Sequence, residues 1–403
     1  MNNPVSKIVV IGGGLAAANA VAELREQGYS GAITVVGAEP HLPYERPPLS
    51  KGLLLGTEQP ESVFVHDRAW YDDHGVELRI GVRATALDRE RGRVLLDDGE
   101  LDYDRLILAT GSTARRLPAL EAGDIPVRYL RTLDESLALK EELTGRLLIV
   151  GAGWIGLEIA AAARQAGAEV TVVENAAWPL LNVLGPELAP LFADLHRGHG
   201  VDLRLGTAVA GVQGSEVLLS DGTRLRPDLI VAGVGAAPAD ELAAAAGLAT
   251  GNGVLVDARL ATADPAVFAA GDVANQAHPS LGRVRVEHWD NAIEQGRHVA
   301  RSVLGDQAPY TRQPYFFSDQ YDLGMEYLGH VGRDGYDELI VRGDRAALNL
   351  VALWVRGGTI VAGLHLNDWD AADSLRLLVG STPDDLDALR DETVPLPRPS
   401  SED

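Results

Sequence analysis

Two segments of the chain repeat one local pattern, and this repetition constrains the fold more than any other feature. Residues 7–39 read as a short apolar strand, a glycine turn, an Ala-rich helix and a second apolar strand, and residues 146–174 read the same way. A glycine stands near the end of each helix, Gly28 in the first segment and Gly167 in the second. A strand, a helix and a parallel strand in succession form a βαβ unit, so the sequence predicts two such units in one α/β chain.

The first glycine turn, residues 12–17, has the residue types that a phosphate-binding turn needs. Gly12 lets the chain reverse, Gly14 lets a pyrophosphate approach the backbone, and Ala17 lets the helix pack closely on the strand. The helix N-terminus then offers free N–H groups and a partial positive charge to the phosphates. A glycine-rich turn without a ligand is the alternative. The carboxylate that holds a ribose is expected after the second strand, where Gly37 stands, and Glu39 two residues on is the candidate, with a plain loop acid as the alternative.

The second turn, residues 151–156, is a complete Gly-x-Gly-x-x-Gly with Gly151, Gly153 and Gly156. Glu174 ends the second strand about 20 residues further on, as the dinucleotide fingerprint requires. A carboxylate at this place accepts a hydrogen bond from a free ribose 2′-hydroxyl and repels a 2′-phosphate. The second unit is therefore predicted to bind NAD(H) rather than NADP(H).

Composition excludes several classes of function. The 403 residues exceed what one domain usually holds, and 58 acidic against 35 basic residues give a formal net charge of −23. This charge argues against nucleic acid and against an anionic membrane as partners. The sequence has no cysteine, which excludes disulfides, zinc–thiolate sites, iron–sulfur clusters and thiol catalysis in this chain. The ten histidines show no metal spacing, the pair His196 and His199 is expected to be solvated, and no metal site is predicted.

Segments outside the two units give weaker signals. Short apolar runs at 93–96 and 106–108, and again at 208–219 and 229–234, suggest small antiparallel layers. Runs at 339–342, 348–355 and 359–364 predict strands of a third, mixed domain, and the acidic, Pro-rich residues 381–403 are expected to fray. The apolar stretch 147–163 contains three glycines and Glu158 and fails as a membrane span. No targeting segment is visible, so a cytoplasmic location and no membrane partner are expected.

Six further segments, taken with the two turns, carry a family resemblance over nearly the whole chain. They are Leu42–Lys51 (LPYERPPLSK), Ala109-Thr110-Gly111, Leu130-Arg131-Thr132, Ala270-Gly271-Asp272, Glu287–Ala292 (EHWDNA) and Tyr315–Leu323 (YFFSDQYDL). The chain resembles the NADH-dependent ferredoxin reductases of oxygenase systems, of the putidaredoxin-reductase type. These are two-dinucleotide-binding FAD flavoproteins, with apoptosis-inducing factor as a cousin.

The resemblance implies a fold of two Rossmann-like domains and a C-terminal α+β domain. The FAD-binding domain would be discontinuous, with residues 1–113 and 237–312. Residues 114–236 would form the NAD-binding domain, and residues 313–403 the C-terminal interface domain.

The same resemblance implies contacts with the flavin. Arg46 and Lys51 would contact FAD, Arg131 would approach the flavin, Asp272 would bind the ribityl chain, and Trp289 would lie beside the flavin ring. The alternatives are solvated loop charges for Arg46 and Lys51, a turn or helix-cap role for Asp272, and a buried core position for Trp289. The aromatic residues of 315–323 are expected to belong to the core.

The implied reaction moves a hydride from NADH to FAD, with the protein supplying orientation and electrostatics and no nucleophile. Glu158, expected on the first turn of the second helix, would lie near the nicotinamide and pair with Lys51; a surface acid favoured by the helix dipole is the alternative. Residues 233–235 would let NADH pass close to the backbone. The predicted catalytic residues are Lys51, Glu158 and Trp289. The predicted cofactor-binding residues are Gly12, Gly14, Ala17, Glu39, Arg46, Lys51, Arg131, Asp272 and Trp289 for FAD, and Gly151, Gly153, Gly156, Glu158, Glu174 and Gly235 for NADH.

The resemblance also implies the electron acceptor, a small iron–sulfur ferredoxin or rubredoxin. Because such partners are usually acidic, docking would need a local basic patch, for which Arg297, Arg301 and Arg312 are candidates. A monomer or weak homodimer is expected. Two other functions stay open at this point: a signalling or binding module like apoptosis-inducing factor, and an NADH oxidase component.

Overall fold

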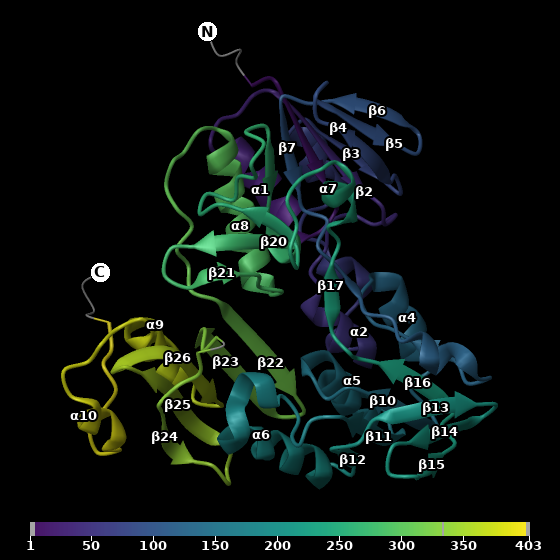
Figure 1. The fold of residues 1–403 in the computed structure, drawn as a ribbon, viewed down its shortest axis with the longest axis vertical. Coiled ribbons are helices and arrows are strands. Elements are labelled where there is room, and N and C mark those ends of the chain that lie inside the picture. The colour runs from purple at the N-terminus through teal and green to yellow at the C-terminus, as the bar shows by residue number, and fades with distance from the viewer. Residues whose placement is uncertain (1–4, 333, 400–403) are drawn as a thin grey trace. The chain divides into compact units, whose positions relative to one another are not determined.

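The computed structural model describes residues 5–332 and 334–399. The chain divides into two compact units, each built from three separate stretches of sequence (Figure 1). The first unit comprises residues 1–47, 59–113 and 236–312, and the second comprises residues 48–58, 114–235 and 313–403. Residues 48–58 thus group with the second unit, although the resemblance assigned them to an FAD-binding domain. The three predicted domains and their boundaries stay a prediction.

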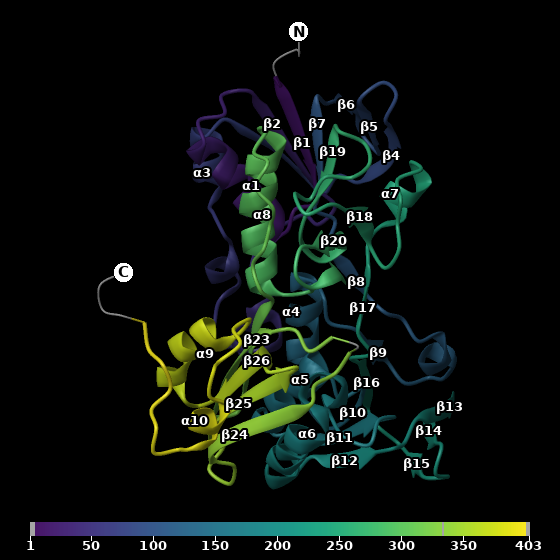
Figure 2. The same cartoon turned by 60° about the vertical axis from the view of Figure 1, so that its left-hand side comes forward.

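A five-stranded parallel sheet forms the centre of the first unit, in the order β19-β7-β1-β2-β3. Its strands are nearly continuous apolar runs because both faces of a parallel sheet are covered. Helices α1 and α8 pack side by side in both views (Figures 1 and 2), so closely that a Cβ on Gly296 would lie 2.5 Å from the carbonyl oxygen of Ala16. The elements are β1 (Lys7–Ile11), α1 (Leu15–Glu26), β2 (Ala32–Gly37), β3 (Val76–Ile80), β7 (Arg105–Leu108), β19 (Val267–Ala269) and α8 (Trp289–Val303).

Smaller elements surround this sheet. A three-stranded antiparallel sheet contains the expected strand at 93–96, but residues 106–108 belong to the parallel sheet as β7, so that part of the prediction was wrong. A run that is apolar on both faces is typical of a buried parallel strand. The elements are η2 (Pro60–Val63), α3 (Arg68–Asp73), β4 (Ala84–Asp88), β5 (Arg93–Leu96), β6 (Gly99–Asp102), α7 (Glu241–Ala245), β18 (Val254–Val256), η4 (Gly271–Val273), β20 (Ala274–His278) and β21 (Gly282–Val284). Strands β8 (Ser112–Ala114) and β17 (Ala236–Pro238) pair where the chain passes between the units.

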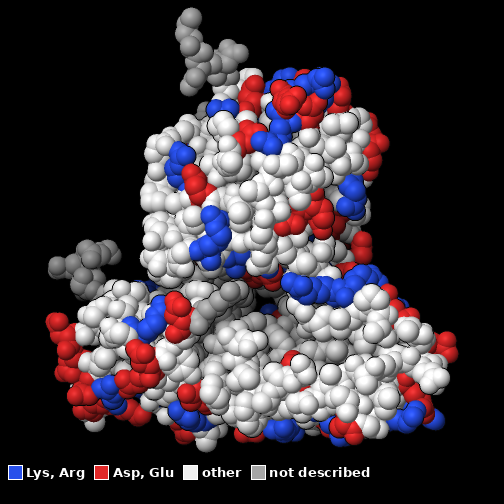
Figure 3. All heavy atoms as spheres, viewed as in Figure 1, with Lys and Arg blue, Asp and Glu red and all other residues white. Residues whose placement is uncertain are grey.

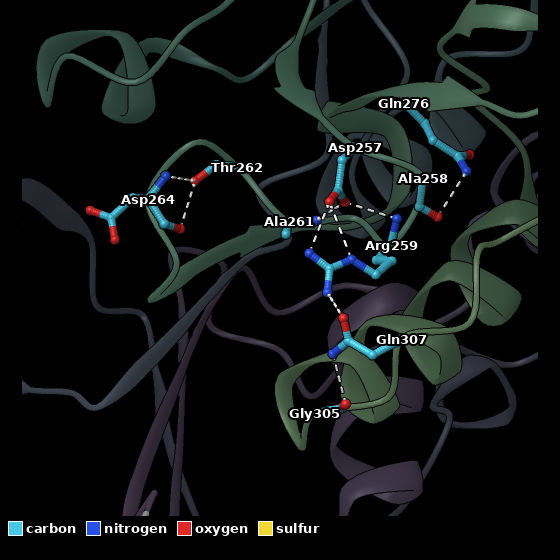
Figure 4. A network of polar contacts seen from close by, with 9 residues as sticks. All are labelled: Asp257, Ala258, Arg259, Ala261, Thr262, Asp264, Gln276, Gly305 and Gln307. Carbon is cyan, nitrogen blue, oxygen red and sulfur yellow. Dashed lines mark hydrogen bonds and ion pairs between the residues drawn. The ribbon is translucent and has the colours of Figure 1, made fainter. Parts of the chain in front are cut away.

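A polar network fixes the loop after β18 to the segment after α8 (Figure 4). The guanidinium of Arg259 lies between Asp257, at 3.2 Å, and the side chain of Gln307. Gln276 of β20 donates to the carbonyl oxygen of Tyr310 at 2.9 Å. These bonds satisfy the polar groups of a loop-rich region, so the network is structural.

The second unit is built on another parallel sheet, in the order β12-β11-β10-β16-β9. The predicted second βαβ unit is confirmed as β10, α5 and β11. Residues 229–232 form β16 of this parallel sheet, and only β13, β14 and β15 make the expected antiparallel layer. The elements are η1 (Pro47–Ser50), α2 (Gly52–Leu55), η3 (Pro118–Ala122), β9 (Val127–Arg128), α4 (Leu133–Glu141), β10 (Arg146–Val150), α5 (Trp154–Gln165), β11 (Glu169–Glu174), α6 (Leu181–Gly198), β12 (Asp202–Leu205), β13 (Val209–Gln213), β14 (Glu216–Leu219), β15 (Arg224–Leu225) and β16 (Leu229–Ala232).

Residues 315–390 complete the second unit with a five-stranded antiparallel sheet, in the order β22-β23-β26-β25-β24, and two short helices (Figure 2). The predicted strands between 339 and 364 are confirmed. The expected fraying of the tail is wrong as far as residue 394, because Leu389 is buried, Arg390 pairs with Glu338 at 2.7 Å and Arg342 donates to the carbonyl oxygen of Val394 at 2.6 Å. Residues 400–403 lie outside the described residues. The elements are β22 (Tyr315–Gln320), β23 (Leu323–Gly329), β24 (Glu338–Asp344), β25 (Asn349–Arg356), β26 (Thr359–Leu366), η5 (Trp369–Ala371), α9 (Ala372–Leu378) and α10 (Leu386–Arg390).

Acidic and basic side chains are interspersed on the face drawn in Figure 3. Surface ion pairs such as Arg79 with Asp98 and Arg146 with Asp228 place opposite charges next to one another. Within residues 5–332 and 334–399, no helix has both the length and the apolar character needed to cross a bilayer.

Candidate nucleotide-binding sites

In the first unit the chain turns sharply between β1 and α1, and the turn glycines differ in what surrounds them. Gly12 has φ +120°, and a Cβ there would lie 2.0 Å from the carbonyl oxygen of Ala109 on the neighbouring strand. Ala17, the third residue of α1, is fully buried. Gly12 and Ala17 therefore serve the packing of strand and helix, as the sequence predicted.

Gly14 serves a different purpose, because the space beside it is open. It is the N-cap of α1, and its helix receives no side-chain cap. A Cβ built on Gly14 would meet no heavy atom of the described residues within 4 Å. An uncapped helix start with room beside it fits the phosphates of a dinucleotide.

The glycine at the position expected for a ribose-binding acid in the first unit has a steric explanation. A Cβ on Gly37 would lie 3.2 Å from the Cα of Gly13, so the end of β2 closely approaches the turn. The candidate acid, Glu39, lies two residues on and accepts from Tyr44 at 2.5 Å and from Arg46 at 3.0 Å. Arg46 and Glu39 thus form an ion pair, so Arg46 is not a freely solvated loop charge. Whether Glu39 binds a ribose or is a loop acid stays a prediction.

Asp272 and Trp289 lie at the starts of two helical elements of the first unit. Asp272, in η4, accepts a hydrogen bond from the hydroxyl of Ser112 at 2.8 Å, a partner that the sequence gave no reason to single out beyond its place just after Ala109-Thr110-Gly111. Trp289 is the first residue of α8 and is half-buried. Burial lowers the pKa of the neighbouring His288 to about 4, against the opposing effect of Asp272 and Asp290.

The turn glycines of the second unit also have two different roles, close packing and room for a ligand. Gly151 has φ +101°, and a Cβ there would lie 2.5 Å from the carbonyl oxygen of Gly233. A Cβ on Gly156 would lie 2.1 Å from the carbonyl oxygen of Gly151. Gly153 is the uncapped N-cap of α5, and a Cβ there meets no described atom within 4 Å. The open position again fits a phosphate, while Gly151, Gly156 and Gly233 are needed for packing.

Glu174 ends β11 beside this turn. Its two carboxylate oxygens accept from the backbone N–H groups of Ala152 and Ala176, each at 2.8 Å. These two bonds hold the carboxylate in place, with lone pairs left for a ribose hydroxyl. Gly235, with φ +92°, follows the end of β16. Arg164 donates to the carbonyl oxygens of Ala168 and His199 and so is committed to the end of α5.

The predicted pair of Lys51 and Glu158 is present in the second unit. The ammonium Nζ lies 2.8 Å from Glu158 Oε2, and the Glu158 side chain is only 4 % exposed. Glu158 is the fifth residue of α5, beyond the first turn, so both the expected first-turn position and the surface-acid alternative are wrong. The hydroxyl of Ser50 also donates to Oε2, and that of Ser318 donates to Oε1 at 2.7 Å.

Ser318 was missed by the sequence reasoning, although a signal for it existed. Residues 316, 318 and 320 alternate onto the buried face of β22, and two of these three are polar. Polar residues on a buried face need partners. Phe316 is buried in the core, as expected, whereas Phe317 is half-buried and lies under Lys51, whose Nζ is 5.5 Å from the ring centre.

Arg131 and the candidate docking arginines complete the predicted residues. Arg131 precedes α4, which starts with a capping box of Thr132 and Glu135. Arg301 pairs with Glu23 at 2.8 Å and Arg312 pairs with Asp290 at 2.7 Å, so their charges are locally balanced. Arg297, on α8, is exposed.

His196 is fully buried in α6, so its expected solvation was wrong; only His199 is exposed. Burial lowers the pKa of His196 to about 4, against the opposing effect of its hydrogen bond to the amide oxygen of Gln320. Between pH 6.5 and 4 the unfolded chain therefore binds more protons than the folded chain, and the free energy of unfolding falls as the pH falls through this window. The loss attributable to His196 is about 3 kcal/mol, at 1.36 kcal/mol per pH unit.

Denaturant unfolding followed between pH 7.5 and 4.5 measures this effect. His196→Gln is expected to flatten the pH dependence, and His199→Gln, which changes the exposed neighbour, is expected to leave it as in the native protein. Equal slopes for all three proteins would show that His196 does not set the dependence.

Comparison with known proteins agrees with this architecture. The model of the pyridine nucleotide-disulphide oxidoreductase family matches residues 6–296, and that of the reductase C-terminal family matches residues 315–398. Putidaredoxin reductase of Pseudomonas putida is 37% identical over 98% of this chain and 96% of its own length. The ferredoxin–NAD(+) reductase component of the anthranilate 1,2-dioxygenase system of Burkholderia cepacia is 39% identical over 96% of this chain and 98% of its own.

Solved structures give the same answer for the fold. The crystal structure of the covalent putidaredoxin reductase–putidaredoxin complex contains a chain that superposes with a TM-score of 0.92, at 37% identity, over 98% of both chains. Both the sequence match and the superposition extend through the parallel sheets and the C-terminal sheet. The chain belongs to the pyridine nucleotide-disulphide oxidoreductase family.

Proposed function

We propose that this chain is an FAD-dependent NADH:ferredoxin oxidoreductase that serves an oxygenase. FAD belongs to the first unit and NADH to the second. Bound FAD supplies the chemistry that the protein lacks, since it accepts a hydride from NADH and releases electrons one at a time. The residues of the chain bind, orient and balance charge.

One observation carries the proposal: each unit contains a glycine turn with the same two kinds of glycine. Gly12 and Gly151 cannot bear a side chain because a neighbouring strand is too close. Gly14 and Gly153 have nothing beside them that would exclude a side chain, yet they too are glycine. A bound pyrophosphate explains the absence of side chains at these two open positions.

The role proposed for Lys51 and Glu158 follows from their burial. A cation and an anion 2.8 Å apart, with two serine hydroxyls on the carboxylate, form a fixed dipole with little freedom to rearrange. Such a preorganised charge pair can orient a nicotinamide and balance the negative charge that reduction adds. Trp289 remains our candidate for the aromatic group beside the flavin. With no cysteine in the sequence, the reaction proceeds without a protein thiol.

The proposed acceptor is a small iron–sulfur ferredoxin or rubredoxin. Relatives of nearly the same length carry ferredoxin–NAD(+) reductase in their names, and one solved relative is a complex with putidaredoxin. We place the reaction in the cytoplasm, where NADH is regenerated.

The test uses the purified chain reconstituted with FAD. NADH should bleach the flavin rapidly, and cytochrome c should be reduced rapidly only after a ferredoxin is added. A slow, long-lived charge-transfer complex with NADH and no ferredoxin dependence would instead favour a binding or signalling module. Rapid oxygen consumption without ferredoxin would favour an NADH oxidase.

Replacing Glu174 should relax the choice of nucleotide. Glu174→Ser removes a charge that repels a 2′-phosphate and a hydrogen bond of about 1.5–3 kcal/mol to a ribose hydroxyl. We expect the preference for NADH over NADPH, measured as the ratio of kcat/KM values, to fall at least about tenfold. The control is Glu169→Ser, at the exposed first residue of the same strand, which should leave the ratio unchanged. A Glu174 variant with the native ratio would remove this residue from the site.

A further inference from the structure

A chain of buried polar side chains leads away from Glu158 inside the second unit. Ser318 Oγ lies 2.7 Å from Glu158 Oε1, and Gln320 Nε2 lies 3.2 Å from Ser318 Oγ. Gln320 Oε1 lies 2.9 Å from His196 Nε2, and the hydroxyl of Tyr321 lies 3.4 Å from His196 Nδ1. We call Glu158, Ser318, Gln320, His196 and Tyr321 the polar chain.

The burial of these groups makes the polar chain unusual. Ser318 and Gln320 are each 1 % exposed and His196 is 0 % exposed, yet they come from β22 and α6, whose facing surfaces are otherwise apolar. Burying a polar group costs free energy unless it is hydrogen-bonded, and apolar residues of similar size would fill the same space. Packing β22 on α6 therefore gives no reason for three polar residues in a row.

The direction of hydrogen bonding follows from the carboxylate that pairs with Lys51 at one end. Glu158 beside Lys51 can only accept, so the Ser318 hydroxyl must donate to it and can then only accept from Gln320. The amide nitrogen of Gln320 thus faces Ser318, and its oxygen accepts from His196 Nε2–H. His196 Nδ1 is left to accept from Tyr321. Every donor points toward Glu158.

Charges on the neighbouring elements are consistent with this direction. Lys51 approaches Glu158 through Oε2, whereas the polar chain approaches through Oε1. Asp319, between Ser318 and Gln320, and Glu326 are further acids near this pair; the pKa of Asp319 is raised, chiefly by desolvation of its carboxyl, with Lys51 opposing and Glu158 and Glu326 adding to the rise. Glu158 is the carboxylate that both Lys51 and the polar chain stabilise.

We propose that Ser318, Gln320 and His196 are positioning residues that hold the Glu158 carboxylate turned toward Lys51. This inference rests on the proposed function for its consequence, namely that Glu158 and Lys51 act during flavin reduction. The structural part of the inference, namely that Lys51 depends on residues two to four contacts away along the polar chain, does not rest on the proposed function.

The sequence offers a clean probe, because Lys7, Lys51 and Lys140 are its only lysines. Protein labelled with ¹⁵N-lysine and loaded with FAD gives a side-chain spectrum simple enough to follow Lys51, assigned by its loss in Lys51→Met. We expect the Lys51 ammonium protons to exchange slowly with water in the native protein. In Ser318→Ala and in Gln320→Leu we expect exchange about tenfold faster, with Lys7 and Lys140 unchanged. Tenfold corresponds to losing about one net hydrogen bond.

Kinetics provide the second measurement. Stopped-flow reduction over a range of NADH concentrations should show a limiting rate constant lowered about tenfold in both variants, with the half-saturating NADH concentration unchanged. Ser374→Ala, at a buried serine of α9 outside the polar chain, is the matched control and should behave as the native protein.

The outcomes separate the possibilities. A Lys51 signal that is native in both folded variants overturns the proposal. A change in Ser318→Ala with none in Gln320→Leu overturns the positioning role of Gln320 and His196. Failure of the native protein to bind FAD or to be reduced by NADH rejects the proposed function instead, and the lysine signal can still be read in that protein.

Discussion

Gly153→Ala is expected to weaken NADH binding by about 10- to 100-fold while the fold and the flavin content stay native. Gly153 has φ −79°, which alanine adopts freely, and a Cβ there would touch no described protein atom within 4 Å. The protein itself therefore does not resist the methyl group. A pyrophosphate bound at the start of α5 would clash with the methyl group, because backbone N–H groups must approach the pyrophosphate closely. A loss of about 1.4–2.8 kcal/mol corresponds to the stated range, and a titration of the holoprotein with NAD⁺ measures it.

Two companion variants show whether this effect comes from the ligand. Gly156→Ala places a Cβ 2.1 Å from the carbonyl oxygen of Gly151, so it should destabilise the second unit rather than weaken binding selectively. Gly14→Ala, at the corresponding open position of the first unit, should lower the amount of FAD that the protein binds and leave its affinity for NADH native. A Gly153→Ala protein that binds NADH with native affinity would remove this turn from the site.

The local part of the fold was predictable from the sequence because its causes are local. A tight turn between a strand and a helix requires glycine where φ is positive, and Gly12 and Gly151 both meet this requirement. The strands and helices that flank the turns follow from apolar periodicity alone. Both βαβ units were therefore placed with nearly correct bounds.

The predictions were wrong where the structure of a segment depends on residues far away in the sequence. Residues 106–108 and 229–232 are too short to show a period, and only their pairing with β1 and β10 makes them parallel strands. His196 looks like a solvated helix residue until Gln320, 124 positions later in the chain, supplies its partner. The Pro-rich tail has no strong propensity, yet Leu389 and Arg390 fix it to the C-terminal sheet.

The residues of the candidate site also fall into those that a local sequence pattern indicates and those that depend on distant contacts. Glu174 could be proposed because the spacing from the glycine turn is a property of one βαβ unit. Glu39 could be proposed only as a second choice, since the close approach of Gly13 to Gly37 depends on how the turn and the second strand pack. Both assignments stay predictions. The pair of Lys51 and Glu158, 107 positions apart, came from resemblance and not from any pattern in the residues. Ser50 was missed because nothing local distinguishes it from other serines. Ser318 was missed although it alternates with Phe316 and Gln320 on the buried face of β22, because only the fold shows which face is buried.

Glu158→Ala is expected to lower the limiting rate constant of flavin reduction by about 100-fold and to destabilise the second unit. The variant leaves the Lys51 ammonium, only 19 % exposed, without its counter-charge, and removing one partner of a buried pair costs about 3–5 kcal/mol. Loss of activity alone would therefore be ambiguous, because a partly unfolded protein also reduces flavin slowly. Urea unfolding and stopped-flow reduction must be measured on the same preparations.

Removing both charges resolves this ambiguity. In Lys51→Met with Glu158→Leu no charge of the pair is left, and apolar side chains of similar volume commonly recover the stability of a buried ion pair. We expect this double variant to regain most of the unfolding free energy that Glu158→Ala loses, while flavin reduction stays slow. Recovery of both quantities would mean that the pair stabilises the fold and has no part in hydride transfer. Recovery of stability alone would mean that the buried charges are retained for the reaction, since the fold does not need them.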